Sequence, residues 1–294
     1  MTAREWFQRA KDENFAIGAF NVDNLDVMRA ICEAGRKMKS PVMLEFSPGE
    51  VEYFGFENIA DLVENTRKDF EIPILLNLDH SSKVDDCLAA LRLRSGSGDP
   101  VFDNVHFDGS ELSLEENIEA TKRVVEAAKA KGTLVEGEID RLPGSSEVHD
   151  EELDPEVVKK SYTDPVKAQR FIQESGVDIF AAVFGNVHGT FPNQPDLDFD
   201  LLSSIRKALP NTFLSMHGGS GIPAVQVKKA IGVGKIVKVN VNTELRAQYR
   251  DALDEALGAK VQEQASYKLA PDIVRAVAAV VEGKIEVFGS GGKI

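Results

Sequence analysis

Short apolar runs rich in β-branched residues alternate along the chain with longer segments in which apolar residues recur at a helical period. This order predicts β-strand and α-helix units that form a parallel sheet. We expect strands at residues 16–20, 42–46, 74–78, 104–107, 133–138, 178–184, 213–217 and 236–241. Helices are expected at residues 25–38, 83–92, 114–130, 164–175, 199–209 and 224–231, with Pro165 and Pro223 near the starts of two of them.

This number of strand and helix units in 294 residues is typical of a TIM (β/α)8 barrel and predicts a single domain over residues 1–294. A doubly wound open sheet is the alternative, because the pattern alone does not say whether the sheet closes. The polar run at residues 141–160 predicts a long loop after the fifth strand, at about residues 139–160, and not a domain boundary. Residues 94–100 are typical of a turn, and the glycine-rich residues 289–292 predict a flexible C-terminal tail.

Composition narrows the classes of function. The net charge is −14, which excludes a sequence-independent grip on nucleic acid or on an anionic membrane, since both require surfaces rich in Lys and Arg. An anionic substrate would therefore need local binding groups such as backbone amides, helix N-termini or a metal ion. Cys32 and Cys87 lie in apolar helical patterns and are expected as buried thiols, not as a disulfide. The sequence shows no secretory signal and no long apolar span, so we expect a cytoplasmic protein.

Polar side chains that can do chemistry follow the predicted strands at their carboxyl ends. In a barrel these ends share one face, so residues far apart in the sequence meet at one site. The series is Asn21, Ser47, Asp79, His80, Asp108, Glu138, His188, His217 and Asn240. This convergence predicts an active site at the carboxyl-terminal mouth of the barrel.

Three of the five histidines belong to this series. A single histidine is more often a hydrogen-bonded structural residue, but His80, His188 and His217 all fall at strand ends. Three imidazoles on one face are typical of a zinc site that keeps its fourth position open for water or substrate. His149 lies in the acidic loop and His106 lies inside the fourth strand, so we leave both out of the metal set. We expect His106 to be a packed strand residue, with an orientation into the barrel near Asp108 as the alternative.

Glycine-rich segments follow the last three strands, at residues 185–189 and 218–221, and residues 240–243 precede a helix. Glycine lets backbone amides approach an anion closely, and the loops after strands seven and eight form the usual phosphate site of a barrel. These segments predict a phosphate-binding site.

Together these motifs resemble those of the class II, metal-dependent ketose-bisphosphate aldolases, and the resemblance spans essentially the whole chain. The motifs that carry it are Leu78-Asp79-His80, Phe107-Asp108-Gly109-Ser110, Glu136-Gly137-Glu138, Phe184-Gly185-Asn186-Val187-His188-Gly189 and His217-Gly218-Gly219-Ser220-Gly221. The resemblance implies cleavage of fructose 1,6-bisphosphate to dihydroxyacetone phosphate and glyceraldehyde 3-phosphate. It also implies that the protein is a homodimer or homotetramer. Whether it needs a monovalent cation near the phosphate loops is left open.

The resemblance assigns a role to each site residue. Zn²⁺ would be bound by His80, His188 and His217, with Asp108 and Glu138 facing a second or alternative metal position. Asp79 would be the acid/base at the C4 oxygen, and Asn240 would contact the substrate near the reacting carbons. Phosphate would lie against Gly189, Gly218, Ser220 and Thr243, with Ser47 at the other end of the substrate. Such a metal is a Lewis acid for the carbanion left when the C3–C4 bond breaks.

The chain departs from the family pattern in three places. The spacing in the loop after the fifth strand is off by about one residue, so Glu147 is the candidate for proton exchange at C1 and Asp150 is second. Asn77 stands where relatives commonly carry His, and His106 stands where they commonly carry an aliphatic residue or Met. At both positions we expect only altered hydrogen bonds.

Alternatives remain open at this stage. Sequence features that favour fructose bisphosphate as substrate conflict with features that favour tagatose bisphosphate. A zinc hydrolase and a noncatalytic phosphosugar-binding barrel are further hypotheses for the function. A Schiff-base lysine would need a lysine inside the barrel. Lys235 begins the eighth strand and Lys238 is expected to face outward, so the lysine route is not favoured.

Overall fold

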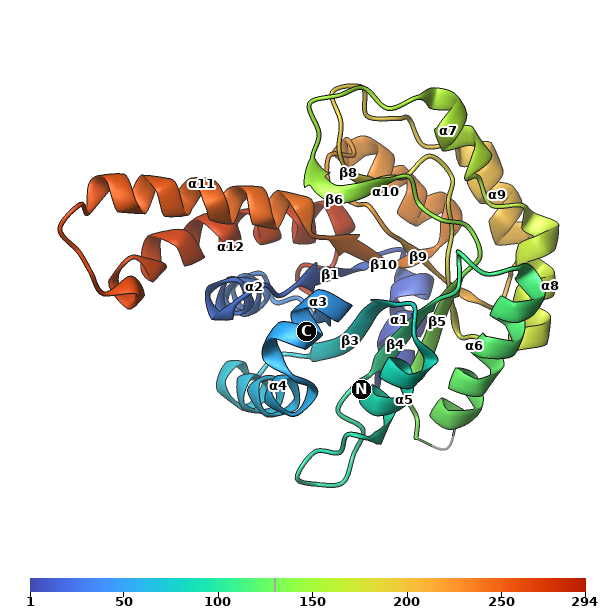
Figure 1. The fold of residues 1–294 in the computed structure, drawn as a ribbon, viewed down its shortest axis with the longest axis horizontal. Coiled ribbons are helices and arrows are strands. Elements are labelled where there is room, and N and C mark those ends of the chain that lie inside the picture. Colours follow the sequence, from blue (N-terminus) through green and yellow to red (C-terminus); the bar gives the residue numbers. More distant parts are fainter. Residues whose placement is uncertain (130) are drawn as a thin grey trace.

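The computed structural model describes residues 1–129 and 131–294, so Ala130, at the expected end of one helix, lies outside the described residues. Eight parallel strands form a closed barrel in the order β1-β10-β9-β7-β5-β4-β3-β2 (Figure 1). Their bounds are β1 Ile17–Asn21, β2 Val42–Phe46, β3 Ile74–Ser81, β4 Asn104–Asp108, β5 Leu134–Glu138, β7 Ile179–Ala181, β9 Phe213–Met216 and β10 Ile236–Val241. The closed sheet confirms the TIM barrel and excludes the open sheet.

The six predicted helices are present, and the structure adds others that the sequence analysis does not predict, so that helices surround this barrel. They are α1 Ala3–Glu13, α2 Leu25–Met38, α3 Pro48–Phe54, α4 Phe56–Phe70, α5 Val84–Arg92, α6 Leu114–Lys129, α7 Pro155–Lys160, α8 Pro165–Ser175, α9 Phe199–Ala208, α10 Ala224–Gly234, α11 Thr243–Ala259 and α12 Ala270–Phe288. Local signals fix their starts. The side chain of Asp164 accepts hydrogen bonds from the backbone of Val166 and Lys167, and Pro165 fills the first helical position, where no N–H partner is needed.

Two apolar clusters place the site at one end of the barrel. The larger cluster lies between the strands and the outer helices. The smaller one fills the amino-terminal end of the barrel, where Trp6 and Phe7 of α1 pack with strand residues such as Met43, Leu75 and Phe213. Since α1 and this apolar layer close one end, polar inward side chains are left to the carboxyl-terminal end.

Two expectations about loops are wrong. Residues 139–160 are not a plain loop, because they contain β6 (Gly144–Val148), which pairs in parallel with β8 (His188–Thr190), and then α7. The C-terminal residues 289–292 are not a free tail. Ser290 is fully buried and accepts a hydrogen bond from Ser40, and the backbone N–H of Gly292 donates to Met38 at the end of α2.

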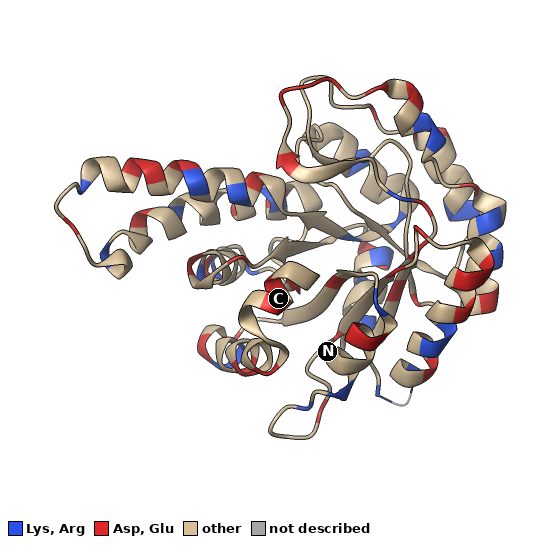
Figure 2. Ribbon diagram, viewed as in Figure 1, with Lys and Arg blue, Asp and Glu red and all other residues tan. Residues whose placement is uncertain are grey.

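The outer surface fits the acidic composition. Figure 2 shows Lys and Arg interspersed with Asp and Glu along the outer helices, without one continuous basic face in this view. Within the part of the chain that the structure describes, no helix has both the length and the apolar character needed to cross a membrane.

Candidate active site

The strand period of two arranges polar side chains in layers inside the barrel. On β4, Asn104, His106 and Asp108 alternate with Val105 and Phe107, which belong to the outer apolar cluster. On β10, Lys238 and Asn240 likewise alternate with Val239 and Val241. The expectation that Lys238 faces outward is therefore wrong. His106 is a packed strand residue, as expected, and it points into the barrel. Since Asp108 and Asn240 face inward, the side chains two residues earlier must do so as well.

The lower polar layer is centred on Lys238, whose side chain is fully buried. Its Nζ lies 2.8 Å from Oε1 of Glu45 and 2.8 Å from Oε2 of Glu136. Burial alone would lower the pKa of Lys238, but the two carboxylates outweigh it and raise this pKa above its ordinary value. A lysine held protonated in this way is a poor nucleophile, which argues against the Schiff-base route although the lysine is inside the barrel.

Two asparagines complete this layer. The Nδ2 of Asn77 donates to Oε1 of Glu45 over 2.7 Å. The Nδ2 of Asn104 donates to Oδ1 of Asn77 over 2.7 Å and to Oε2 of Glu136 over 3.0 Å. Asn77 is thus part of a buried network that holds Glu136 in place. The expectation that hydrogen bonds at Asn77 differ from those of the relatives stays a prediction.

The upper layer contains the predicted metal-binding nitrogens. The Nε2 of His217 donates to Oε1 of Glu136 over 2.8 Å, which leaves Nδ1 as the free nitrogen. The Nδ1 of His80 lies 3.2 Å from Asp108 and 3.1 Å from Glu138, so carboxylates hold its proton and turn Nε2 toward His217. The Nε2 of His80 and the Nδ1 of His217 lie 2.7 Å apart and share a hydrogen bond. Burial lowers the pKa of His217 to about 3, and the charge of His80 adds to this shift, so this imidazole is in the neutral form that binds metals.

These positions fit a divalent metal ion. Donor atoms of Asp79, His80, His106 and His217 all lie within 4.8 Å of one another, and those of His80, Asp108 and Glu138 do as well. His188 is not part of either group. Its ring centroid is 5.0 Å from that of His80 and 6.5 Å from that of His217.

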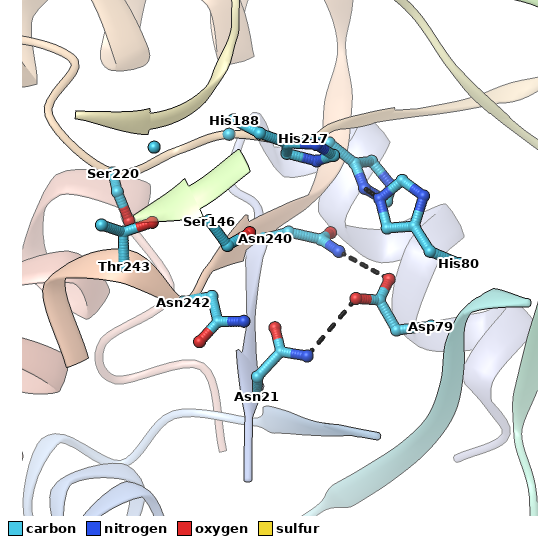
Figure 3. A pocket seen from close by; sticks show the side chains of 12 residues that line it. Asn21, Asp79, His80, Ser146, His188, His217, Ser220, Asn240, Asn242 and Thr243 are labelled. Atoms are coloured by element: carbon cyan, nitrogen blue, oxygen red, sulfur yellow. Dashed lines mark hydrogen bonds between the residues drawn. The ribbon is translucent and has the colours of Figure 1, made fainter. Parts of the chain in front are cut away.

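Asp79 lies between the metal-binding residues and two amides. Its carboxylate accepts hydrogen bonds from Asn240 over 3.1 Å and from Asn21 over 3.4 Å (Figure 3). Burial acts to raise its pKa, but the nearby charge of His80 and a contact with His106 hold the pKa of Asp79 below its ordinary value. The carboxylate is therefore ionised and able to accept a proton.

One continuous cavity contains most of the predicted residues. Its inner part is lined by Asn21, Asp79, His80, Ser146, His188, Gly189, His217, Gly218, Ser220, Asn240, Asn242 and Thr243 (Figure 3). Its outer part shares several of these residues and adds Ser47, Asp108, Glu138 and Arg246. The sequence analysis missed Arg246, and it includes Asn242 only as part of the segment 240–243. Arg246 is paired with Asp23 and Glu50, so it joins the first and last β/α units at the cavity wall.

The end of the cavity predicted to bind phosphate is built from the tight backbone turn after β9 and from the start of α11. Gly218 has a φ of 65°, and a Cβ there would lie 1.9 Å from the backbone oxygen of Val187. Asn242 precedes α11 without capping it through its side chain, so the positive end of the helix dipole lies beside the cavity, where it favours an anion. The backbone N–H of Glu244 in this first turn donates to Oγ of Ser220 over 3.3 Å. Glu244 anchors the turn by accepting from the backbone of Gly221 and pairing with Lys284.

The loop candidate Glu147 is placed differently from the other predicted residues. Glu147 is exposed and lines neither part of the cavity, whereas its neighbour Ser146 is half-buried and lines both. On strand β6 adjacent side chains point to opposite sides, so only one of the two can face the cavity. Asp150 is also outside the cavity lining, and the assignment of Glu147 stays a prediction.

Comparisons with known proteins all point to aldolases. The family model for "Fructose-bisphosphate aldolase class-II" matches residues 1–293. The chain is 34% identical to the fructose-bisphosphate aldolase of Streptococcus pneumoniae serotype 4, covering 100% of this chain and 99% of that protein. It is 35% identical to the sulfofructosephosphate aldolase of Alkalicoccus urumqiensis, covering 100% and 98%. Among solved structures, the YdjI aldolase from Escherichia coli K12 has a TM-score of 0.82 at 29% identity, covering 99% of this chain and 97% of that one.

Proposed function

The chain belongs to the class II fructose-bisphosphate aldolase family, and on this premise we propose that it reversibly cleaves fructose 1,6-bisphosphate to dihydroxyacetone phosphate and glyceraldehyde 3-phosphate with Zn²⁺. One observation carries the proposal. The ionised Asp79 lies beside the converging nitrogens of His80 and His217, in a cavity that ends at the glycine turn after β9 and at the start of α11.

The residues present fit a zinc ion, because neutral imidazoles with carboxylates behind them are its usual protein ligands. His80, His188 and His217 would hold it, with Asp108 and Glu138 near an alternative position. Bound there, Zn²⁺ would supply a Lewis acid for the negative charge that develops next to the substrate carbonyl.

The chain's own residues account for binding and proton transfer. One phosphate would be held at Gly189, Gly218, Ser220 and Thr243, where backbone amides and a helix start face the cavity. Asp79 takes the proton of the C4 hydroxyl, and the C3–C4 bond breaks as C4 becomes an aldehyde. The electron pair stays on the three-carbon fragment as an enediolate. Asn21 and Asn240 fix the Asp79 carboxylate for this step.

The proposal also covers the proton exchange at C1 of the substrate and the oligomeric state of the protein. Glu147 is the proposed base for proton exchange at C1, although it lies outside the cavity in this structure, and Ser47 is proposed at the far end of the substrate. A homodimer or homotetramer is the proposed assembly.

A second candidate substrate is supported by one comparison. The relative from Alkalicoccus urumqiensis is named sulfofructosephosphate aldolase, and its identity to this chain is as high as that of the fructose-bisphosphate aldolases. A phosphorylated ketose with a sulfonate in place of the distal phosphate would leave the proposed phosphate site and Asp79 in the same roles. Tagatose 1,6-bisphosphate is a stereochemical alternative at C4.

The test is a retro-aldol assay with fructose 1,6-bisphosphate, tagatose 1,6-bisphosphate and sulfofructose 1-phosphate, each with and without EDTA. We expect triose phosphate from the fructose substrate at the highest kcat/KM, lost on chelation and restored by Zn²⁺. Asp79→Ala should keep its zinc and lose about 10²- to 10⁴-fold in kcat. Asp69→Ala, an exposed carboxylate on α4, is the control. Full activity after thorough chelation, or no cleavage of any ketose phosphate, would contradict the proposal.

A further inference from the structure

Glu50 is a carboxyl group close to the cavity to which the family resemblance gives no role. It lies in the first turn of α3, and its side chain is only 7% exposed. It lines neither part of the cavity, so it does not itself touch a substrate bound there. Because a glutamate is rarely buried unless it is paired, its partners indicate what it holds in place.

Three donors converge on the carboxyl group of Glu50. Its Oε2 accepts from the backbone N–H of Ser47 over 2.6 Å and from Nδ2 of Asn21 over 3.2 Å. Its Oε1 accepts from Arg246 over 3.1 Å. Arg246 also donates to Asp23 over 2.9 Å, so the position of the arginine does not depend on Glu50 alone.

The bond from Asn21 to Glu50 does not require Glu50 to be charged. Burial raises the pKa of Glu50 to about 8, and a contact with Asp23 adds to this shift. Two N–H groups already point at Oε2, so a proton on this carboxyl group would bind to Oε1 instead. Oε2 therefore accepts from Asn21 in both protonation states.

The amide of Asn21 joins Glu50 to Asp79. Its Nδ2 carries two hydrogens and donates to Oε2 of Glu50 over 3.2 Å and to Oδ2 of Asp79 over 3.4 Å (Figure 3). The bond to Glu50 is the shorter one, and it orients the amide so that its second hydrogen is aimed at Asp79. The terminal torsion of an asparagine has broad preferences, so without Glu50 the amide could turn and present its oxygen to the Asp79 carboxylate.

We propose that Glu50 is a positioning residue that holds the amide of Asn21 with an N–H group on Asp79. A side chain on α3 thus fixes a side chain on β1, and this one fixes the carboxylate on β3. The effect on the reaction rate rests on the role of Asp79 in the proposed function. The orientation of Asn21 does not depend on any activity.

The test is Glu50→Leu, which keeps a good helix former but removes the acceptor. In crystals of the full chain, we expect Nδ2 of Asn21 to move beyond about 3.5 Å from Asp79. For fructose 1,6-bisphosphate, kcat should fall about 10-fold, which is part of the 10²- to 10⁴-fold that a positioned base contributes. KM should change less than about 3-fold, because Glu50 does not line the cavity.

A double-substitution cycle separates positioning from packing. Asn21→Ala removes the amide through which Glu50 would act. Adding Glu50→Leu to Asn21→Ala should therefore lower kcat less than about 2-fold further, whereas independent effects would multiply. The control is Glu52→Leu, which makes the same change at an exposed position of α3 and should alter neither kcat nor the orientation of Asn21.

Three results would overturn the inference. They are an Asn21 amide that still donates to Asp79 in the Glu50→Leu crystals, an unchanged kcat with the amide turned, and losses in kcat that multiply in the double variant. A wild-type chain that cleaves no ketose phosphate would overturn the proposed function instead, and the crystals would still decide whether Glu50 orients Asn21.

Discussion

The Nε2 atom of His217 lies 2.8 Å from Oε1 of Glu136, and both side chains are buried in the barrel. The same Glu136 oxygen accepts from the hydroxyl of Ser215, and the other oxygen accepts from Lys238 and Asn104. Glu136 is therefore held ionised, and its pKa lies well below the ordinary value, because the charges of Lys238 and His106 and the hydrogen bond from His217 outweigh the effect of burial. The carboxylate fixes both the orientation and the tautomer of His217.

Replacing Glu136 by Gln should consequently weaken metal binding. The amide cannot hold the Nε2 proton as a carboxylate does, so Nδ1 loses its preference for the metal-binding form. We expect the zinc Kd to rise about 10- to 100-fold, as for other partners behind metal-binding histidines. Chelator competition measures it, with the exposed Glu57→Gln as control. An unchanged Kd in a folded variant would show that Glu136 serves the fold alone.

Lys238→Met should destabilise the fold even without metal. The substitution leaves Glu45 and Glu136 buried and without their cation, and removing one partner of a buried ion pair costs about 3–5 kcal/mol. Urea unfolding of the metal-free proteins measures this. Lys228→Met, at an exposed position of α10, changes the same residue type and should cost less than about 0.5 kcal/mol. If both variants unfold at the same urea concentration, the buried network does not stabilise the barrel.

The barrel and the convergence of its site could be predicted from sequence, because both follow from strand order. Closure puts all carboxyl ends at one mouth, and Asp79, His80 and His217 indeed meet there. The orientation of Lys238 and His106 was also within reach, since each lies two residues before an inward-facing residue. For Lys238, the preference for placing charged residues outside outweighs that period in the sequence analysis, whereas for His106 the inward orientation stays open there.

Other features needed partners that are distant in the sequence. β6 is polar and has no apolar alternation to mark it, and it becomes a strand only by pairing with His188–Thr190. The same pairing places Ser146 toward the cavity in place of Glu147. The C-terminal residues are held by Ser40 and the end of α2, a contact between opposite ends of the chain that no local pattern encodes.

Gly218→Ala should disturb the proposed phosphate site. A Cβ at this position would lie 1.9 Å from the backbone oxygen of Val187 and would sit at a φ of 65°, which side chains rarely adopt. The turn must shift, so we expect KM for a phosphorylated substrate to rise at least about 10-fold and stability to fall by more than about 1 kcal/mol. Gly283→Ala in α12 meets nothing within 4 Å and should instead stabilise the helix by roughly 0.5–1 kcal/mol. Equal effects of the two substitutions would contradict this account of the turn.

Cys32 and Cys87 should be unreactive in the folded chain over the neutral and mildly alkaline range. Both are fully buried, and burial raises the pKa of each thiol to about 12. Since the thiolate is the reactive form, about one molecule in 10⁴ would be reactive at pH 8, and raising the pH to 9 brings this only to about one in 10³. Labelling with a thiol reagent should therefore be negligible in buffer at either pH and reach two thiols per chain in urea. Rapid stoichiometric labelling of the folded chain at pH 8 would show that one of the two helices that carry these residues opens readily.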